Sequence, residues 1–411
     1  MNFSSECAHG QDIKYSDRLQ SLGWRVIGVS SDSLKLPCAE TSSDLPEAME
    51  IQTTCPTAEE AALLHAALND FSRDGARSAY ADWLASAGED ARAATVRQTI
   101  EAYHSFDAAA LENVAGTPAW QMMLGVPFLQ AFAESELKAD RTAFELFRDQ
   151  FFGLIRPAVL FAYAEAGEET PAVGSSYLWG QPDMPAGSEW PLVAEATNWF
   201  SAKDKLPADY PMLFVGQFNY AEFGGTVFGQ SLPKRGGFSV FSICEAMEFG
   251  IVEIVLRSWP DASVLVRREA PKLAEDTLGD SSNLPQPCHR IVAREILSLP
   301  DADGPMGQTV AGSWSSDQKI FYEDLWFICE DVRNAFQQSL DFEMDETVSL
   351  GLGGYLTATS GEDPSPNADS LRFAVLRTNP DCNIAHFAIP QADFPSGNLE
   401  RVAYVWNDWD S

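Results

Sequence analysis

The sequence predicts an α+β fold, in which an N-terminal helical module precedes a mixed, mainly antiparallel β-sheet domain with few helices. Between residues 57 and 166, apolar side chains recur at spacings of three and four, which is typical of amphipathic helices. After Gly167, proline, glycine and tryptophan become more frequent and the apolar runs shorten to strand length. The chain has 411 residues, of which 45% are hydrophobic and 11% aromatic, enough for a sizeable core in two or three domains.

The first part of the chain is polar and contains three prolines. We therefore expect a lead-in with little regular structure at residues 1–56, apart from a short strand at 24–29. Thr57, with Glu60 three residues later, has the pattern of a capping box and predicts the start of a helix. Two further amphipathic stretches follow within the helical module, which we place at residues 57–166.

The second half of this module is rich in phenylalanine. Thr117 followed by Pro118 predicts a helix start, because proline fits the first turn of a helix. Asp140 is placed to cap another helix, along which one face carries Phe144, Phe147, Phe151 and Ile155. We expect Pro157 to kink or split that helix before Phe161. The phenylalanine stripe is expected to be part of the core.

The remaining chain, residues 167–411, reads as the β-sheet domain, so the domain boundary is placed near residue 166. Strand-length apolar runs occur at 212–218, 237–243, 251–256, 263–266, 371–376 and 384–389. One helix is expected at 316–338, where Phe321, Leu325, Ile328, Val332 and Phe336 recur at spacings of three and four. Residues 212–243 and 371–394 resemble each other weakly, which indicates an internal duplication.

The chain is strongly acidic, with 60 Asp and Glu against 27 Lys and Arg and a formal net charge of −33. Such a balance argues against direct binding of nucleic acid, whose phosphates need basic residues. Charge spread evenly would be largely screened by salt, so only clustered acids would steer a partner. The densest acidic window is 317–346, which is either a solvated helix face with an acidic loop or a docking surface for a basic protein. The residues predicted to contact that partner are Glu323, Asp324, Glu330, Asp331, Asp341, Glu343, Asp345, Glu346, Trp406 and Trp409.

Motifs for known chemistry are missing from the sequence. The five histidines show no metal-binding spacing, and Cys288 and His289 are neighbours that would point to opposite faces of a strand. The glycines at 351–354 lack the residues of a phosphate-binding loop and are better explained by a tight turn. We therefore expect no catalytic residue, cofactor or metal. Seven cysteines without a CxxC pair, and no apolar run of membrane-spanning length, predict a cytoplasmic protein that does not bind a membrane.

Residues 58–104 contain Tyr80-Ala81-Asp82-Trp83-Leu84, then Gly88-Glu89-Asp90, Arg92-Ala93 and Arg97. This segment resembles the small helical "repeat-companion" domain found near the N-termini of many bacterial proteins. Tyr80, Trp83 and Leu84 would form one apolar helix face, and Gly88 would allow the left-handed turn that ends the helix. The resemblance implies a scaffold or adaptor module.

The segment 174–410 contains a series of short motifs, which are Gly180-Gln181-Pro182-Asp183-Met184-Pro185, Glu189-Trp190-Pro191, Val215-Gly216-Gln217-Phe218-Asn219, Leu232-Pro233, Leu297-Ser298-Leu299-Pro300, Gly353-Gly354-Tyr355 and Asp393-Phe394. With these motifs in this order, the segment resembles the YwqG-like family, a bacterial domain of unknown function. Residues 379–383 depart from the Trp-Gly-Asp turn that the family usually has before its penultimate strand. Because members of the family occur among candidate immunity proteins of bacterial toxin systems, the resemblance implies such a role.

Together these observations predict a non-enzymatic, acidic immunity protein that neutralises a bacterial toxin by binding it directly. The alternatives are a domain that binds a small ligand or peptide, with Trp190 and Gln217 lining a cleft, or an enzyme of unrecognised type. Gln217 lies in an otherwise apolar strand. Its amide must find partners there, either in the neighbouring backbone or in a ligand.

Overall fold

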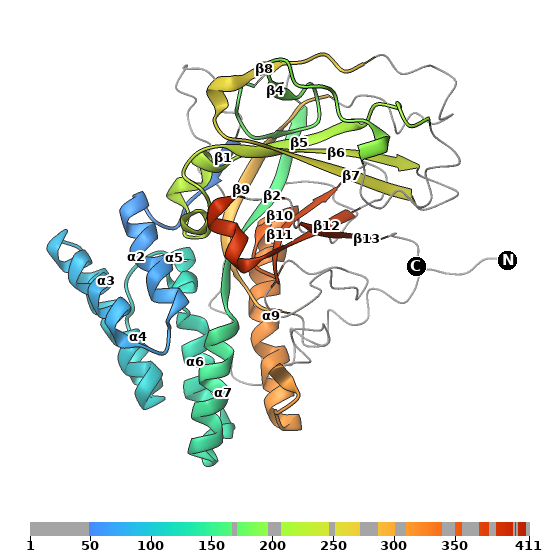
Figure 1. Cartoon of the computed structure of the whole chain (residues 1–411). Helices are drawn as coiled ribbons and strands as arrows, with labels where there is room; N and C mark the ends of the chain where they lie inside the picture. The colour runs from blue at the N-terminus through green and yellow to red at the C-terminus, as the bar shows by residue number, and fades with distance from the viewer. Residues whose placement is uncertain are drawn as a thin grey trace.

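The predicted fold class is confirmed: a group of N-terminal helices precedes a curled, mainly antiparallel sheet (Figure 1). The computed structural model describes residues 49–166, 171–195, 207–245, 251–271, 287–300, 310–338, 350–355, 370–377, 384–397, 399 and 402–407. The strand predicted at 24–29 lies outside these residues. Over the described ranges, no helix combines the length and apolar character needed to cross a membrane.

The helical region begins at α2 and ends at α7. Its helices are α2 (Ala58–Asn69), α3 (Asp74–Ser86), α4 (Asp90–Ser105), α5 (Pro118–Met123), α6 (Val126–Glu134) and α7 (Arg141–Leu154), with 3₁₀ turns η1 (Ala108–Leu111) and η2 (Glu136–Ala139). The side chains of Thr57, Thr117 and Asp140 accept hydrogen bonds from backbone N–H groups three residues later, at 3.1, 3.3 and 3.1 Å. These are the N-terminal caps that the sequence predicts.

The sheet has its strands in an order that differs from their order in the chain. The strands are β1 (Met49–Gln52), β2 (Arg156–Ala166), β3 (Tyr177–Leu178), β5 (Leu213–Asn219), β6 (Gly237–Glu245), β7 (Ile251–Trp259), β9 (His289–Ser298), β10 (Leu350–Gly353), β11 (Ser370–Arg377), β12 (Ile384–Pro390) and β13 (Ala403–Asn407). They are arranged as β13-β12-β11-β10-β2-β9-β3-β5-β6-β7, and β1 pairs with β9 in parallel. A separate ribbon of β4 (Asp183–Pro185) and β8 (Leu265–Arg267) lies above the sheet (Figure 1).

The expectation that Pro157 kinks a continuing helix is wrong. Helix α7 ends at Leu154, and Pro157 is the second residue of β2, where it pairs with Leu297 of β9. Proline cannot donate the backbone hydrogen bond that a helix interior needs, and the chain leaves the helix before it. The four residues that follow, 158–161, are all buried, as expected for a central strand covered on both faces. Strand β1 likewise gives regular structure to Met49–Gln52, within the predicted lead-in.

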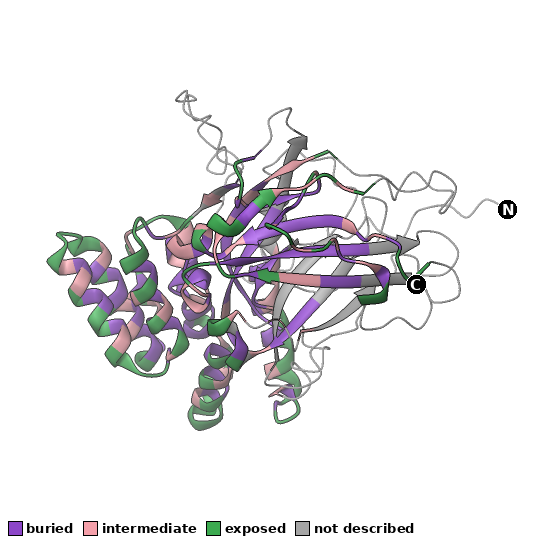
Figure 2. Cartoon of the chain, turned by 45° about the horizontal axis from the view of Figure 1, so that its top comes forward, coloured by how far each residue is buried: buried purple, intermediate pink, exposed green. Residues whose placement is uncertain are grey.

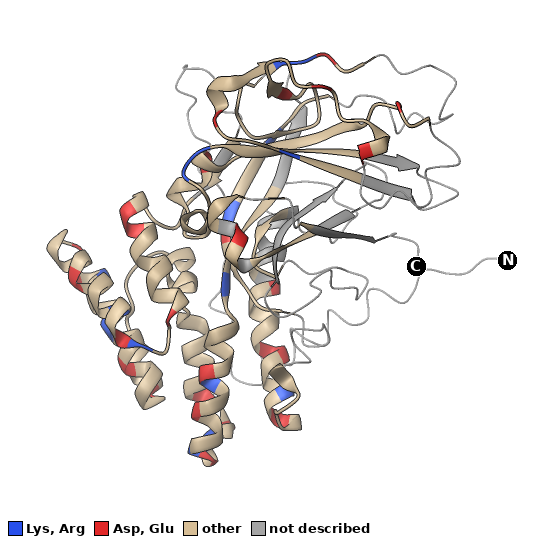
Figure 3. Ribbon diagram, in the orientation of Figure 1, with Lys and Arg blue, Asp and Glu red and all other residues tan. Residues whose placement is uncertain are grey.

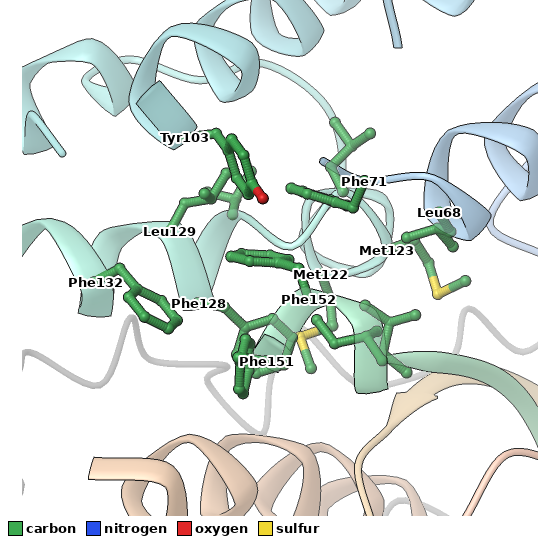
Figure 4. Close-up of a cluster of buried hydrophobic side chains, with 14 of the residues drawn as sticks. Leu68, Phe71, Tyr103, Met122, Met123, Phe128, Leu129, Phe132, Phe151 and Phe152 are labelled. Atoms are coloured by element: carbon green, nitrogen blue, oxygen red, sulfur yellow. The ribbon is translucent and has the colours of Figure 1, made fainter. Parts of the chain in front are cut away.

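Helix α9 (Ser316–Gln338) completes the core of the N-terminal helices, although it lies far from them in the sequence (Figures 1 and 2). Its Phe321 ring lies 5.2 Å from that of Phe132 in α6, and Trp314, just before the helix, lies 4.9 Å from Phe147 in α7. Figure 4 shows the aromatic and methionine side chains gathered between α4, α6 and α7. The predicted phenylalanine stripe is therefore core.

A second core lies within the curl of the sheet. Phe161 of β2 stacks on Phe218 of β5 at 5.4 Å, and Phe218 stacks on Phe238 of β6 at 5.0 Å. Phe387 and Ile389 of β12 belong to the same buried cluster, although β12 lies near the other end of the strand order. The two ends of the sheet thus share one hydrophobic core.

Candidate functional site

The acidic residues predicted to bind a partner are divided between α9 and segments outside the described residues. Glu323 is exposed on α9, while Asp324 and Glu330 are half-buried there; Asp331 occupies the next position of the helix. The residues outside the description are Asp341, Glu343, Asp345, Glu346 and Trp409. Trp406 lies in β13, paired with Ala385 at the edge of the sheet and not on α9.

Acidic residues are also spread over other parts of the surface. Figure 3 shows them on α2, α3, α4 and α7 as well as along α9. Several are paired with arginine, as in the exposed pairs Arg97–Asp82 at 2.9 Å and Arg141–Glu145 at 2.8 Å. The acids of α9 are therefore one part of a broadly negative surface.

Gln217 is completely buried, and both ends of its amide are bonded within the protein. Its Oε1 accepts the backbone N–H of Asp183 at 2.9 Å. Its Nε2 donates to the carbonyl of Ser175 at 2.7 Å and to the Asp183 carboxylate at 2.9 Å. In this arrangement the amide holds the Gly180–Pro185 segment against β5, the first of the two roles that the sequence left open.

The Asp183 carboxylate is the centre of this network. It is fully buried and accepts from the backbone N–H of Gly174 at 2.8 Å and from Nε of Arg267 at 2.5 Å. Arg267 also donates to the carbonyl of Pro171 at 2.9 Å, and its guanidinium lies 5.3 Å from the ring centre of Tyr177. The buried charge is thus paired and hydrogen-bonded, and it ties β4 and β8 to the underlying sheet.

Trp190, the other residue of the alternative site, is half-buried. Its indole N–H donates to the carbonyl of Met212 at 2.8 Å, and its ring lies 5.6 Å from Phe241, edge to face. Trp190 therefore packs at the margin of the small core between the ribbon and β5–β6. Cys288 also contacts that core, and burial raises the pKa of its thiol to about 11, so it is held protonated at neutral pH.

A buried carboxylate that the sequence analysis missed, Glu295 of β9, joins the helices to the sheet. It accepts from both the backbone N–H and the hydroxyl of Thr54 at 2.8 Å, and from the backbone N–H of Val227. Burial raises the pKa of Glu295, while these hydrogen bonds oppose the shift. The signal in the sequence was a glutamate, next to Arg294, within the otherwise mainly apolar segment Ile291–Leu299.

His65 of α2 contacts the backbone carbonyl of Val227, the residue whose N–H donates to Glu295. Its Nδ1 lies 3.0 Å from the Val227 carbonyl oxygen and its Nε2 lies 2.7 Å from the amide nitrogen of Asn69. This pattern fits a neutral ring protonated on Nδ1. Burial lowers the pKa of His65, which favours that neutral form.

Within the helices, two residues of the Tyr80–Arg97 motif, Tyr80 and Arg92, meet at the carboxylate of Glu60. Tyr80 donates to the buried carboxylate of Glu60 at 2.7 Å and accepts from the indole of Trp120 at 2.8 Å. Arg92 pairs with the same carboxylate, and its guanidinium lies 4.4 Å above the Trp120 ring. These side chains hold α2, α3, α4 and α5 together.

The Gly353-Gly354 pair forms a tight turn at the end of β10. Both residues have positive φ, 76° and 63°. A Cβ at Gly353 would lie 2.2 Å from the Phe228 ring, and one at Gly354 would lie 2.2 Å from the Ser298 hydroxyl. Only glycine fits this conformation and these close approaches.

Comparison with known families gives one assignment. Within the described part of the chain, no group of three or more His, Cys, Asp or Glu side chains could hold a metal ion. No curated protein matches the sequence significantly. The family described as Domain of unknown function (DUF1963) matches residues 176–407, which is more than half of the chain and includes the Asp183–Gln217 network, Glu295 and α9. The chain therefore belongs to the DUF1963 family.

Proposed function

We propose that this protein is a non-enzymatic, acidic immunity protein that binds a cationic bacterial toxin directly. The observation that carries the proposal is the placement of Glu323, Asp324 and Glu330 on α9. One side of that helix is anchored in the core through Tyr322 and Leu325, which are completely buried. The acidic side chains are therefore carried by a helix that is fixed in the core, where they can contact a partner.

The grouping of acids along one helix supports the same proposal. Clustered acids attract a basic protein over a distance of about one Debye length, roughly 8 Å at physiological salt. Complementary charge mainly raises the association rate, and desolvated aromatic or apolar contacts supply most of the affinity. A toxin that acts on nucleic acid would present the cationic surface that such acids can cover.

We further infer that the matched family domain is YwqG-like and that residues 58–104 are a repeat-companion module. In support of the second inference, the motif residues Tyr80 and Arg92 serve the internal packing of three successive helices, as a scaffold module requires. We place the protein in the cytoplasm, where its cysteines would stay reduced.

Binding to a toxin encoded next to the gene tests the proposal. The triple variant Glu323→Gln, Asp324→Asn, Glu330→Gln should associate about tenfold more slowly at low salt and protect cells less in co-expression. The matched control neutralises three exposed acids elsewhere, Glu59→Gln, Glu101→Gln and Glu112→Gln. Equal association rates for the two triple variants would show that α9 is not part of the binding surface. Absence of binding by the parent protein would contradict the proposed function itself.

A further inference from the structure

Strand β1 fills a notch that its neighbouring strands leave in the sheet. One edge of β9 pairs with β2 over nearly its whole length, whereas on the other edge β3 pairs with it only at His289. Ser176 would continue that pairing, but its N–H donates to Glu222 at 3.0 Å and its hydroxyl accepts from the N–H of Asn219 at 2.8 Å. Among the described strands, β1 alone pairs with this edge of β9 at residues 291–294 (Figure 1).

The notch has the parts of a binding site for an extended chain. Its backbone edge is β9, and its floor is the core of the sheet, in which Met49 is only 7% exposed and against which Ile51 packs. At one end, the buried carboxylate of Glu295 accepts both the N–H and the hydroxyl of Thr54 at 2.8 Å. The segment that fills the notch is thus held by its backbone, by alternate apolar side chains and by one hydroxyl.

Strand β1 also differs from the strands that build the sheet. It has four residues and pairs with one strand, and it lies off the continuous strand order that runs from β13 to β7. Strand β2, which likewise precedes the matched family region, has 11 residues and pairs on both edges. A short strand with one partner opens at a lower free-energy cost than a central strand, so β1 can leave while the rest of the sheet stays intact.

We propose that the edge of β9 at residues 291–294 is an acceptor site for an extended peptide of another protein, and that Met49–Thr54 occupies it as an intramolecular ligand. The peptide would add a strand to the sheet, with affinity from main-chain hydrogen bonds and specificity from alternate side chains. The positions of Met49, Ile51 and Thr54 define its sequence: two apolar residues separated by one position, then Ser or Thr three positions later. This inference concerns β9 and does not rest on the proposed function.

A synthetic peptide of residues 47–56, with Cys55→Ser to prevent disulfide formation, is the probe for this site. In the full chain, the double variant Met49→Asp, Ile51→Asp would place carboxylates in the apolar core and so release β1 from the notch. We expect this opened variant to bind the peptide at least about tenfold more tightly than the parent protein, in which β1 competes for the site. Fluorescence anisotropy measures both affinities.

Two controls test whether the peptide binds as a strand in the notch. The variant Leu146→Asp, Ile320→Asp adds the same charge at side chains that are 61% and 47% exposed, and it should bind like the parent. A peptide that itself carries Met49→Asp and Ile51→Asp should not bind the opened variant, and one with Thr54→Val should bind about tenfold more weakly. Equal affinities of the opened and control variants, or of the original and doubly substituted peptides, would overturn the proposal.

Hydrogen exchange in the parent protein gives a test that needs no substitution. Because β1 must detach while the sheet stays intact, the slowest amide hydrogen of Met49–Gln52 should exchange at least about a hundredfold faster than the slowest of residues 158–161 in β2. Equal rates would make β1 a permanent strand and contradict the proposal. If the opened variant does not unfold cooperatively, Ile51→Ser replaces it in the binding experiment, with the same expected order of affinities.

Discussion

At the scale of single residues, the Asp183–Arg267 pair shows how the Gln181-Pro182-Asp183 segment is held. Arg267→Met should lower the free energy of unfolding by about 3–5 kcal/mol, because it leaves the buried Asp183 carboxylate without its cation. Adding Asp183→Asn should recover part of that loss by removing the unpaired charge. Urea denaturation of the two variants measures the difference.

The matched control for this prediction is an ion pair on the surface. Arg257 and Glu195 are 42% and 37% exposed, so Arg257→Met should cost less than about 1 kcal/mol. A cost for Arg267→Met as small as that of the control would mean that the Asp183 network contributes little to stability.

His65 predicts a dependence of stability on pH. Burial is the largest cause of its lowered pKa, and the nearby charge of Lys234 acts in the same direction, against the bond to the Val227 carbonyl. The unfolded chain therefore binds a proton at His65 more readily than the folded chain. As the pH falls below the ordinary histidine value of 6.5, this residue should destabilise the fold, by at most about 1.4 kcal/mol per pH unit.

The variant His65→Gln keeps a donor for the Val227 carbonyl and removes the titrating group. Lowering the pH from about 7.5 to about 5.5 should therefore reduce the melting temperature of the parent more than that of the variant. Parallel losses of stability in the two proteins would contradict the assignment of a neutral His65 at this junction.

At the scale of elements, cations and aromatic rings alternate across α3, α4 and α7. Arg77 lies over the rings of Phe71 and Tyr103 at 4.5 and 4.8 Å, and Arg148 lies over Tyr103 at 3.9 Å and Phe106 at 5.0 Å. Both guanidinium groups also have carboxylate partners, Asp74 and Asp149. Flat guanidinium groups can therefore bridge these helices where a lysine ammonium could not.

Arg148→Lys should accordingly lower the free energy of unfolding by about 1–3 kcal/mol, since it keeps the charge but loses the stacking and part of the hydrogen bonding. Arg141→Lys is the control, because Arg141 lies 5.9 Å from Phe106 with a side chain that is 68% exposed. Its cost should stay below about 1 kcal/mol. Similar midpoints in urea for the two variants would show that stacking does not matter here.

The helices and caps that could be predicted from the sequence are those whose signals lie in neighbouring residues. The caps at Thr57, Thr117 and Asp140 and the stripe of α9 were all readable from nearby residues. Strand β2 was not, because the same apolar run around Phe161 suits a helix or a buried strand, and pairing with β9 decides between them.

In the candidate site, too, contacts between residues that are far apart in the sequence could not be predicted. Gln217 could be identified as a buried amide in need of partners, but its bonds to Asp183 and Ser175 span 34 and 42 residues. Glu295 reaches Thr54 across 241 residues, and nothing near either residue in the sequence indicates that contact.

At the scale of the whole molecule, the helices and the sheet domain share a hydrophobic core. Trp314, Tyr322, Leu325 and Cys329, from the region matched by the DUF1963 family, are buried against the phenylalanines of α6 and α7. Glu295 adds hydrogen bonds from β9 to Thr54 and Val227. The N-terminal helices therefore depend on residues that come more than 100 positions later in the chain.

This dependence predicts the behaviour of a fragment that contains residues 57–166 alone. Without α9, Phe132, Phe147 and Phe151 would face water, and β2 would lack its partner strands. We expect the fragment to retain helical far-ultraviolet circular dichroism, to bind the dye ANS and to unfold without a sharp transition. Cooperative unfolding of the fragment with little ANS binding would instead show that the helices form an independent domain, and that α9 is an accessory to their core.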